Sequence, residues 1–213
     1  MHSRAIEQLK ATLKLSNIQR EVLVGLLLGD AHLETQNRGR TYRVKFEYSA
    51  KHREYAEHLY GLFQPWVLSP PQRELDDSHD NVWFQTVSHP AFRFYAHQFY
   101  DGHQKCVPRN IHRLLTARSI AYWFMDDGSI KSRESKGVIF NTQGFARKDV
   151  KRLVDILCSH FSLEASERRQ PDGWQIFVSG KSHERFRQIV DPYIHQSMLY
   201  KVPVDRKTKM PKL

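Results

Sequence analysis

Cysteine is scarce in this sequence, and its two copies have no partners at a ligand spacing. Cys106 and Cys158 lie far apart, with no CxxC pair and no combination of cysteine and histidine typical of metal ligands. This pattern argues against both a zinc site and a disulfide framework. It suits a protein that stays in a reducing environment.

Long apolar runs are also missing. No stretch approaches the roughly 20 apolar residues of a membrane-spanning helix. The N-terminal MHSRAIEQLKATLKL carries charges throughout, where a secretory signal would have an apolar core. We therefore expect a protein without a membrane segment that is not secreted. The compartment stays open between an organelle (mitochondrion or chloroplast) and the prokaryotic cytoplasm.

Acidic residues are the third deficit. The 213 residues include 23 Asp and Glu against 33 Lys and Arg, which gives a formal charge of +10 and a pI near 9.7. A polyanionic partner is the usual reason for such a surplus, and a merely basic surface is the plain alternative. With 40% hydrophobic and 12% aromatic residues, the chain can bury a core in one large or two small units.

The chain passes twice through one order of predicted elements. The first pass begins with VLVGLLLGDAH (22–32) and the second with SIAYWFMDDGS (119–129), two apolar runs that stop at an acid beside a small residue. Aligning Asp30 on Asp127 brings the following segments into step. Each run is followed by a predicted strand, helix, strand and short helix, at 42–49, 51–66, 81–88 and 92–99 in the first pass and at 138–143, 150–161, 173–180 and 186–190 in the second.

Each pass also ends on a lysine at the same distance from its acid. Lys105, in KCVP, follows Asp30 by 75 residues, and Lys201, in KVP, follows Asp127 by 74. The agreement of several elements favours a true duplication. The alternative is coincidence, since such αββαββα patterns are common and Lys-x-Pro is a weak motif.

The apolar runs predict two helices that pack against each other. VLVGLLLG is apolar on every side, which predicts a helix buried all round. Gly25 and Gly29, four residues apart, allow another helix to approach closely, and the segment Ile120–Met125 is the natural partner. This packing brings the C-terminal ends of both helices together, with Asp30, Asp127 and the adjacent Asp126.

Two carboxylates at helix C-termini repel each other and face the negative ends of the helix dipoles. A cation between them relieves this repulsion, and carboxylate oxygens with backbone carbonyls and water favour Mg²⁺ over Zn²⁺. The alternative is that both acids only begin the following turns. In a basic protein, acid-bound metal indicates phosphoryl transfer, in which Lys105 and Lys201 could act on the attacking water or neutralise charge on the phosphate.

At these motifs the sequence resembles the LAGLIDADG homing endonucleases. VGLLLGDAH (24–32) fits the family motif with Gly25 at the glycine and Asp30 at the acid, and IAYWFMDDG (120–128) fits it with Asp127 at the acid. The resemblance extends to FQPWVLSPP (63–71), NTQGF (141–145) and SMLYKVP (197–203), so it covers nearly the whole chain. Tyr122 departs from the motif, which has glycine there, so we expect the helix contact to be asymmetric or less tight at that point.

The resemblance implies an α+β fold of two pseudo-symmetric αββαββα halves, with antiparallel saddle-shaped sheets over the DNA and a central two-helix interface. We expect the halves to span 1–115 and 116–213 within one compact monomer, without an obligatory protein partner. The implied activity is double-strand cleavage of a long asymmetric DNA target, leaving short 3′ overhangs. The implied cofactor is Mg²⁺, with Mn²⁺ as a substitute and Ca²⁺ supporting binding without cleavage.

The resemblance also assigns roles to individual residues. Asp30 and Asp127 are expected to bind metal, helped by the backbone carbonyls of Gly29 and Asp126, and Lys105 and Lys201 are the basic residues of the two active sites. The expected DNA-binding residues lie in three places: Arg43 and Lys45 on the predicted strand, Lys131 and Arg133 after the second motif, and Arg168 and Arg169 in a predicted hairpin tip. Taken singly, each of these is more often a solvated surface residue. His32, beside the first acid, is a further residue near the expected site, and Lys207, Lys209 and Lys212 are expected to form a disordered arm that contacts phosphates or nothing.

Two other function classes stay open at this stage. One is a nucleic-acid-binding module on the same scaffold, such as an RNA maturase or a regulator that has lost cleavage. A pure binder has no need of two acids and two lysines, although their retention does not exclude a second maturase role. The other is a structural protein without metal, which leaves the charge and the paired acids unexplained.

Overall fold

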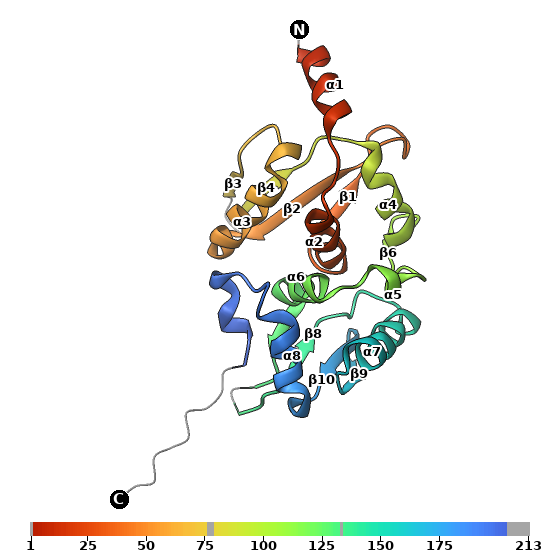
Figure 1. The fold of residues 1–213 in the computed structure, drawn as a ribbon, viewed down its shortest axis with the longest axis vertical. Coiled ribbons are helices and arrows are strands. Elements are labelled where there is room, and N and C mark those ends of the chain that lie inside the picture. Colours follow the sequence, from red (N-terminus) through yellow and green to blue (C-terminus); the bar gives the residue numbers. More distant parts are fainter. Residues whose placement is uncertain (1, 76–78, 133, 204–213) are drawn as a thin grey trace, which may run out of the picture.

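The computed structural model describes residues 2–75, 79–132 and 134–203, and Figure 1 shows its two halves with α2 and α6 between them. Arg133 and the lysines at 207, 209 and 212 therefore lie outside the described residues. Within the described ranges, every helix is too short or too polar to cross a bilayer.

The first half follows the predicted order of elements. Its central elements are α2 (Asn17–Leu28), β1 (His32–Glu34), β2 (Arg43–Ser49), α3 (Arg53–Phe63), β3 (Gln72–Leu75), β4 (Asp80–Gln85) and α4 (Arg93–Phe99). Three short 3-10 helices lie beside them, η1 (Ala50–His52), η2 (Gln64–Trp66) and η3 (Pro90–Phe92), and α1 (His2–Thr12) precedes them. The predicted αββαββα order is confirmed. The predicted helix 51–66 is α3 with a 3-10 turn at each end.

The second half repeats this order. It contains α6 (Ala117–Asp127), β7 (Gly128–Ile130), β8 (Val138–Phe140), α7 (Arg147–Phe161), β9 (Ala165–Gln170), β10 (Gly173–Val178), η4 (Gly180–Ser182), α8 (His183–Val190) and η5 (Gln196–Lys201). A hairpin of β5 (Tyr100–Asp101) and β6 (Gln104–Lys105), followed by α5 (Ile111–Leu114), joins the halves. The predicted strand 138–143 is shorter in the structure: β8 ends at Phe140, and the side chains of Asn141 and Thr142 donate to the Asp127 and Trp174 carbonyls.

The two sheets have the same topology. Their strand orders are β1-β2-β4-β3 and β7-β8-β10-β9, and all pairs are antiparallel. Along β2, Val44, Phe46 and Tyr48 are buried and the residues between them lie on the other face, as the period-2 pattern predicts. Helices cover one face of each sheet, which leaves the other face for a partner.

Local sequence explains how the central helices begin. Ser16 caps α2 through a capping box with Gln19, and Thr116 caps α6 by accepting the Ser119 N–H at 3.2 Å. Both caps satisfy amides that have no partner within the helix. The apolar residues that follow are buried in both helices.

The helices meet at Gly25, and the contact is asymmetric. A Cβ atom on Gly25 would lie 2.3 Å from the Ser119 carbonyl oxygen and 3.0 Å from the Tyr122 Cβ. The glycine of one motif therefore makes room for the tyrosine that departs from the other. The Tyr122 hydroxyl lies 2.7 Å from His58 Nε2 on α3, so this side chain contacts the first half.

Candidate active site

The ends of α2 and α6 bring three acids of the two motifs together. α6 runs through Asp127, whereas α2 ends at Leu28 with Gly29 as its C-cap. Asp30 follows in the turn, and its amide donates to Asp126 Oδ2 at 3.0 Å. The predicted meeting of the two motif ends is thus present in the structure.

Burial raises the pKa values of all three acids, and the charge of Asp30 adds to this effect at Asp126 and Asp127. Burial, and then the charge of Asp30, raises the pKa of Asp127 to about 7. Burial and the same neighbour raise the pKa of Asp126 well above its ordinary value. The pKa of the solvent-accessible Asp30 is also raised, because desolvation by the surrounding protein outweighs the opposing effect of Lys201 and Lys105. In the absence of a cation, the surroundings of these three aspartates therefore favour their protonated, neutral forms.

The two lysines contact equivalent backbone positions. Lys105 Nζ, on β6, donates to the Gly29 carbonyl at 2.6 Å, and Lys201 Nζ, at the end of η5, donates to the Asp126 carbonyl at 2.7 Å. Burial lowers the pKa of both lysines, and the nearby aspartates partly offset this effect. Each lysine thus bonds to the carbonyl just before the acid that it follows by 75 or 74 residues in the sequence. The larger lysine effect on the pKa of each acid comes from the lysine of the other motif, Lys201 for Asp30 and Lys105 for Asp127.

Different local structures hold the two lysines in place. Tyr100 pairs with Lys105 across the β5–β6 hairpin, and the Tyr100 hydroxyl accepts the Leu33 N–H of β1 at 3.0 Å. In the second half, His195 caps η5, and its own amide contacts Met125 Sδ at 3.2 Å. The matching distances along the sequence therefore arise from two unlike segments.

The structure adds four residues that the sequence did not single out. Tyr55 and Tyr48 donate their hydroxyls to Asp126 Oδ1 at 3.1 and 3.5 Å, and the side-chain amide of Asn141 donates to the Asp127 carbonyl at 3.0 Å. His52 is close enough to Asp30 to influence its pKa. Alternation along 42–49 marks Tyr48 as inward-facing, but no sequence signal gives its hydroxyl a partner.

The donor set fits a hard divalent cation. In the described ranges, no three His, Cys, Asp or Glu side chains cluster as a metal site. Mg²⁺ is typically held by one or two carboxylates together with water and substrate phosphate. Two mutually repelling carboxylates, with the Gly29 and Asp126 carbonyls beside them, match that requirement.

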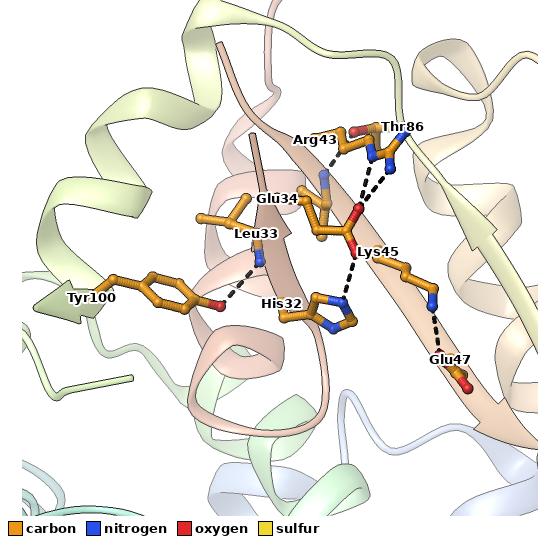
Figure 2. A network of polar contacts seen from close by, with 9 residues as sticks. His32, Leu33, Glu34, Arg43, Lys45, Glu47, Thr86 and Tyr100 are labelled. Atoms are coloured by element: carbon orange, nitrogen blue, oxygen red, sulfur yellow. Dashed lines mark hydrogen bonds and ion pairs between the residues drawn. The ribbon is translucent and has the colours of Figure 1, made fainter. Parts of the chain in front are cut away.

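On the open face of the first sheet, the predicted basic residues form ion pairs. Arg43 Nη2 lies 2.7 Å from Glu34 Oε2, and Lys45 Nζ lies 2.8 Å from Glu47 Oε2 (Figure 2). His32 Nε2 contacts the other oxygen of Glu34 at 3.2 Å. His32 is thus part of this strand network.

On the second sheet, Arg168 and Arg169 lie within β9 and not at the tip of its hairpin, and strand register separates them. Arg168 pairs with Gln175 on the open face and lies 3.4 Å from the centre of the Phe177 ring. Lys131 lies over the same ring at 5.3 Å. Arg169 pairs with Trp174, on the face that α7 covers. The structure therefore does not bring Arg169 together with the other strand residues, because neighbouring side chains of a strand point to opposite faces.

Comparisons with known proteins agree on one family. Residues 20–186 match the model of the LAGLIDADG DNA endonuclease family. "Probable intron-encoded endonuclease 1" of Wickerhamomyces canadensis is 34% identical over 198 residues, which cover 88% of this chain and 85% of that protein. DNA endonuclease I-ChuI of Chlamydomonas applanata is 26% identical, with 89% of this chain and 96% of that protein covered.

A solved structure gives the same result. The homing endonuclease I-WcaI, solved with its DNA recognition sequence, matches with a TM-score of 0.88 and 31% sequence identity, over 95% of this chain and 94% of that one. The duplicated fold, the paired acids and these similarities agree. The chain therefore belongs to the LAGLIDADG DNA endonuclease family and is a DNA endonuclease.

Proposed function

We propose that this endonuclease cuts both strands of a long asymmetric DNA target, using Mg²⁺ held by Asp30 and Asp127, and leaves short 3′ overhangs. The observation that carries the proposal is the symmetric placement of Lys105 and Lys201 on the Gly29 and Asp126 carbonyls. It gives each motif its own lysine, and a duplex has two strands to cut.

Each residue has a distinct part in this proposal. Asp30 and Asp127 bind Mg²⁺, helped by the carbonyls of Gly29 and Asp126. Mg²⁺ bound there supplies polarisation of the scissile phosphate and stabilisation of the leaving 3′ oxygen.

Both lysines have N–H donors that are not used on backbone carbonyls and can contact the reacting groups. An ammonium group has three N–H donors. Lys105 uses one on the Gly29 carbonyl, and Lys201 uses two, on the Met125 and Asp126 carbonyls. At least one donor on each lysine is left for the attacking water or a phosphate oxygen, where it offsets developing negative charge.

DNA binding is assigned to the open faces of the two sheets. Arg43 and Lys45 contribute from the first sheet, and Lys131 and Arg168 from the second. Arg169 is not included, because it lies on the opposite face. We further propose that the halves divide between residues 115 and 116, just before α6, and that the protein acts as a monomer in an organelle or in the prokaryotic cytoplasm.

The test is cleavage of a plasmid library with randomised inserts, in Mg²⁺, Mn²⁺, Ca²⁺ or EDTA. We expect the wild type to make double-strand breaks at one sequence with Mg²⁺ or Mn²⁺, and to bind that sequence without cutting it in Ca²⁺. Asp30→Asn and Asp127→Asn should each abolish double-strand cleavage and retain binding in Ca²⁺. Asp155→Asn, at an exposed acid paired with Lys151 on α7, is the matched control and should cut like the wild type.

Specific binding without cleavage in any metal would contradict the proposal and favour a binding module, such as an RNA maturase. Cleavage that persists in EDTA would contradict the assigned metal. Mapping both ends of the cut DNA decides whether the overhangs are 3′.

A further inference from the structure

The two acids are supported differently, although their motifs are equivalent in sequence. Asp127 is the last residue of α6, so the helix itself sets its position. Asp30 lies two residues beyond the end of α2. On either side of Asp30, the amides of Gly29 and Ala31 both bond to carbonyls of α2. The amide of Asp30 donates across the interface to Asp126 Oδ2 at 3.0 Å instead.

Within the described residues, the hydrogen-bond donors to the Asp126 carboxyl group all come from the first half. Tyr55, on α3, donates to Asp126 Oδ1 at 3.1 Å, and Tyr48, on β2, lies 3.5 Å from the same oxygen. Both tyrosines are buried, with exposed fractions of 0% and 5%. A carboxyl group of the second half is thus fixed between a backbone amide and two hydroxyls of the first half.

The other motif has no room for an equivalent group. Gly29 occupies the position in the first motif that Asp126 occupies in the second. A Cβ atom on Gly29 would lie 2.5 Å from both Cβ and Oδ2 of Asp126. Only one of the two positions can therefore carry a side chain. The Asp126 carboxyl group of the second motif bonds to the Asp30 amide of the first, and the first motif has no side chain that could make the reverse contact. We call this contact between Asp126 and the Asp30 amide the bridge.

We propose that Asp126 is a positioning residue whose side chain fixes the backbone of Asp30, and that only the Asp30 half of the active site depends on it. This role is additional to any contact that the Asp126 carbonyl makes with metal. It rests on the proposed function, because Asp30 must bind metal for its position to matter in cleavage. Small displacements of a catalytic group can cost about a hundredfold in rate.

The test compares the two strands during cleavage of a supercoiled plasmid that carries the target. Asp126→Ala removes the acceptor of the Asp30 amide. We expect it to slow the cutting of one strand by about tenfold to a hundredfold relative to the other. Nicked circles should then accumulate with the break on the same strand each time. Asp126→Asn keeps an acceptor oxygen and should restore balanced cleavage of both strands.

Tyr122→Phe is the matched control. It also removes a polar contact between α6 and the first half, the one to His58, but leaves the Asp30 amide bonded. We expect this variant to cut both strands at equal rates. Equal rates on both strands in Asp126→Ala, whether normal or reduced, would overturn the proposal.

A second measurement needs neither metal nor cleavage. In the metal-free wild type, the Asp30 amide should exchange its hydrogen slowly, and Asp126→Asn should keep most of this protection. Fast exchange in the wild type, at the rate of an exposed loop amide, would overturn the proposal even if Asp126→Ala does not fold. If the wild type fails to cut any DNA, the proposed function fails, and the exchange experiment still decides whether the bridge exists.

Discussion

At the residue scale, the active site is defined by negative charge that the protein does not neutralise fully. Burial and the neighbouring Asp30 raise the pKa of Asp127 from its ordinary 3.8 to about 7. Two lysines oppose the shift, but each also bonds to a backbone carbonyl. In the metal-free protein, ionising these aspartates therefore costs free energy, and a bound cation would remove this cost.

Replacing Asp127 should change the pH dependence of stability. The folded protein keeps a proton on Asp127 up to a pH of about 7, whereas the unfolded chain loses it near 3.8. The free energy of unfolding of the wild type therefore falls as pH rises between these values and levels off above them. In Asp127→Asn this fall in the free energy of unfolding should be absent, because the amide does not titrate. In EDTA, we expect its stability relative to the wild type to rise by about 3 kcal/mol between pH 5 and pH 8, because the fall extends over two pH units, from 5 to 7, at about 1.4 kcal/mol per unit.

Denaturant titrations at the two pH values measure this difference. A stability difference between variant and wild type that is the same at pH 5 and pH 8 would contradict the shifted pKa. With limiting Mg²⁺, cleavage by the wild type should also slow as pH falls below about 7, because protons and the cation compete for the carboxylate.

At the element scale, the contact between α2 and α6 joins the halves and sets the acids side by side. The closest approach is at Gly25, opposite the Ser119 carbonyl. One helical turn before Gly25, Ser119 Oγ donates to the Glu21 carbonyl at 2.9 Å, and Arg118 pairs with the Glu21 carboxylate at 2.9 Å. The interface thus combines a glycine contact with polar bonds.

Gly25→Ala should weaken this interface. Its Cβ would lie 2.3 Å from a backbone oxygen, so one helix must move. Overpacking of this kind costs about 1–3 kcal/mol. Gly61→Ala is the matched control, because Gly61 lies exposed within α3 with nothing within 4 Å of its added Cβ. It should gain about 0.5–1 kcal/mol from helix propensity.

Urea unfolding of both variants checks this prediction. Unchanged stability in Gly25→Ala would show that the helices do not approach as closely as described. We also expect Gly25→Ala to reduce cleavage, because the movement displaces Asp30 relative to Asp127.

At the scale of the whole molecule, the open faces of the two sheets differ in how their basic residues are paired. On the first, Glu34 and Glu47 pair with Arg43 and Lys45. On the second, Lys131 and Arg168 lie over Phe177, and neither forms an ion pair within the described part of the chain. Of these four basic residues, the two without an acidic partner in the described chain therefore both lie on the second sheet.

This asymmetry predicts different salt dependences of DNA binding. Lys131→Ala and Arg168→Ala should each reduce the slope of log affinity against log salt by about 1, as expected for the loss of a phosphate contact. Arg43→Ala should reduce the slope less, because Glu34 already neutralises this arginine. Binding titrations in Ca²⁺ at several salt concentrations measure the slopes. Equal reductions for Arg43 and Arg168 would show that the Glu34 pair opens on DNA.

Much of this protein could be predicted from the sequence, because the determining signals are local. Apolar periodicity predicted the main helices and one strand of each pair in both halves, the family resemblance supplied the full αββαββα order, and the motifs located Asp30, Asp127 and the lysines. The alternation along 42–49 gave the buried face of β2 correctly. These features depend on side-chain periods and motif spacing, which are properties of the chain itself.

Other features were decided only by tertiary structure, because they depend on register and on distances between segments far apart in the chain. The sequence offered Asp126 for its carbonyl, whereas its side chain bridges to Asp30 and two tyrosines over 71 to 96 residues. Arg168 and Arg169 looked alike until the pairing of β9 with β10 placed them on opposite faces. The asymmetry between two similar halves arises in the same way, since a shared interface has room for only one of two equivalent side chains.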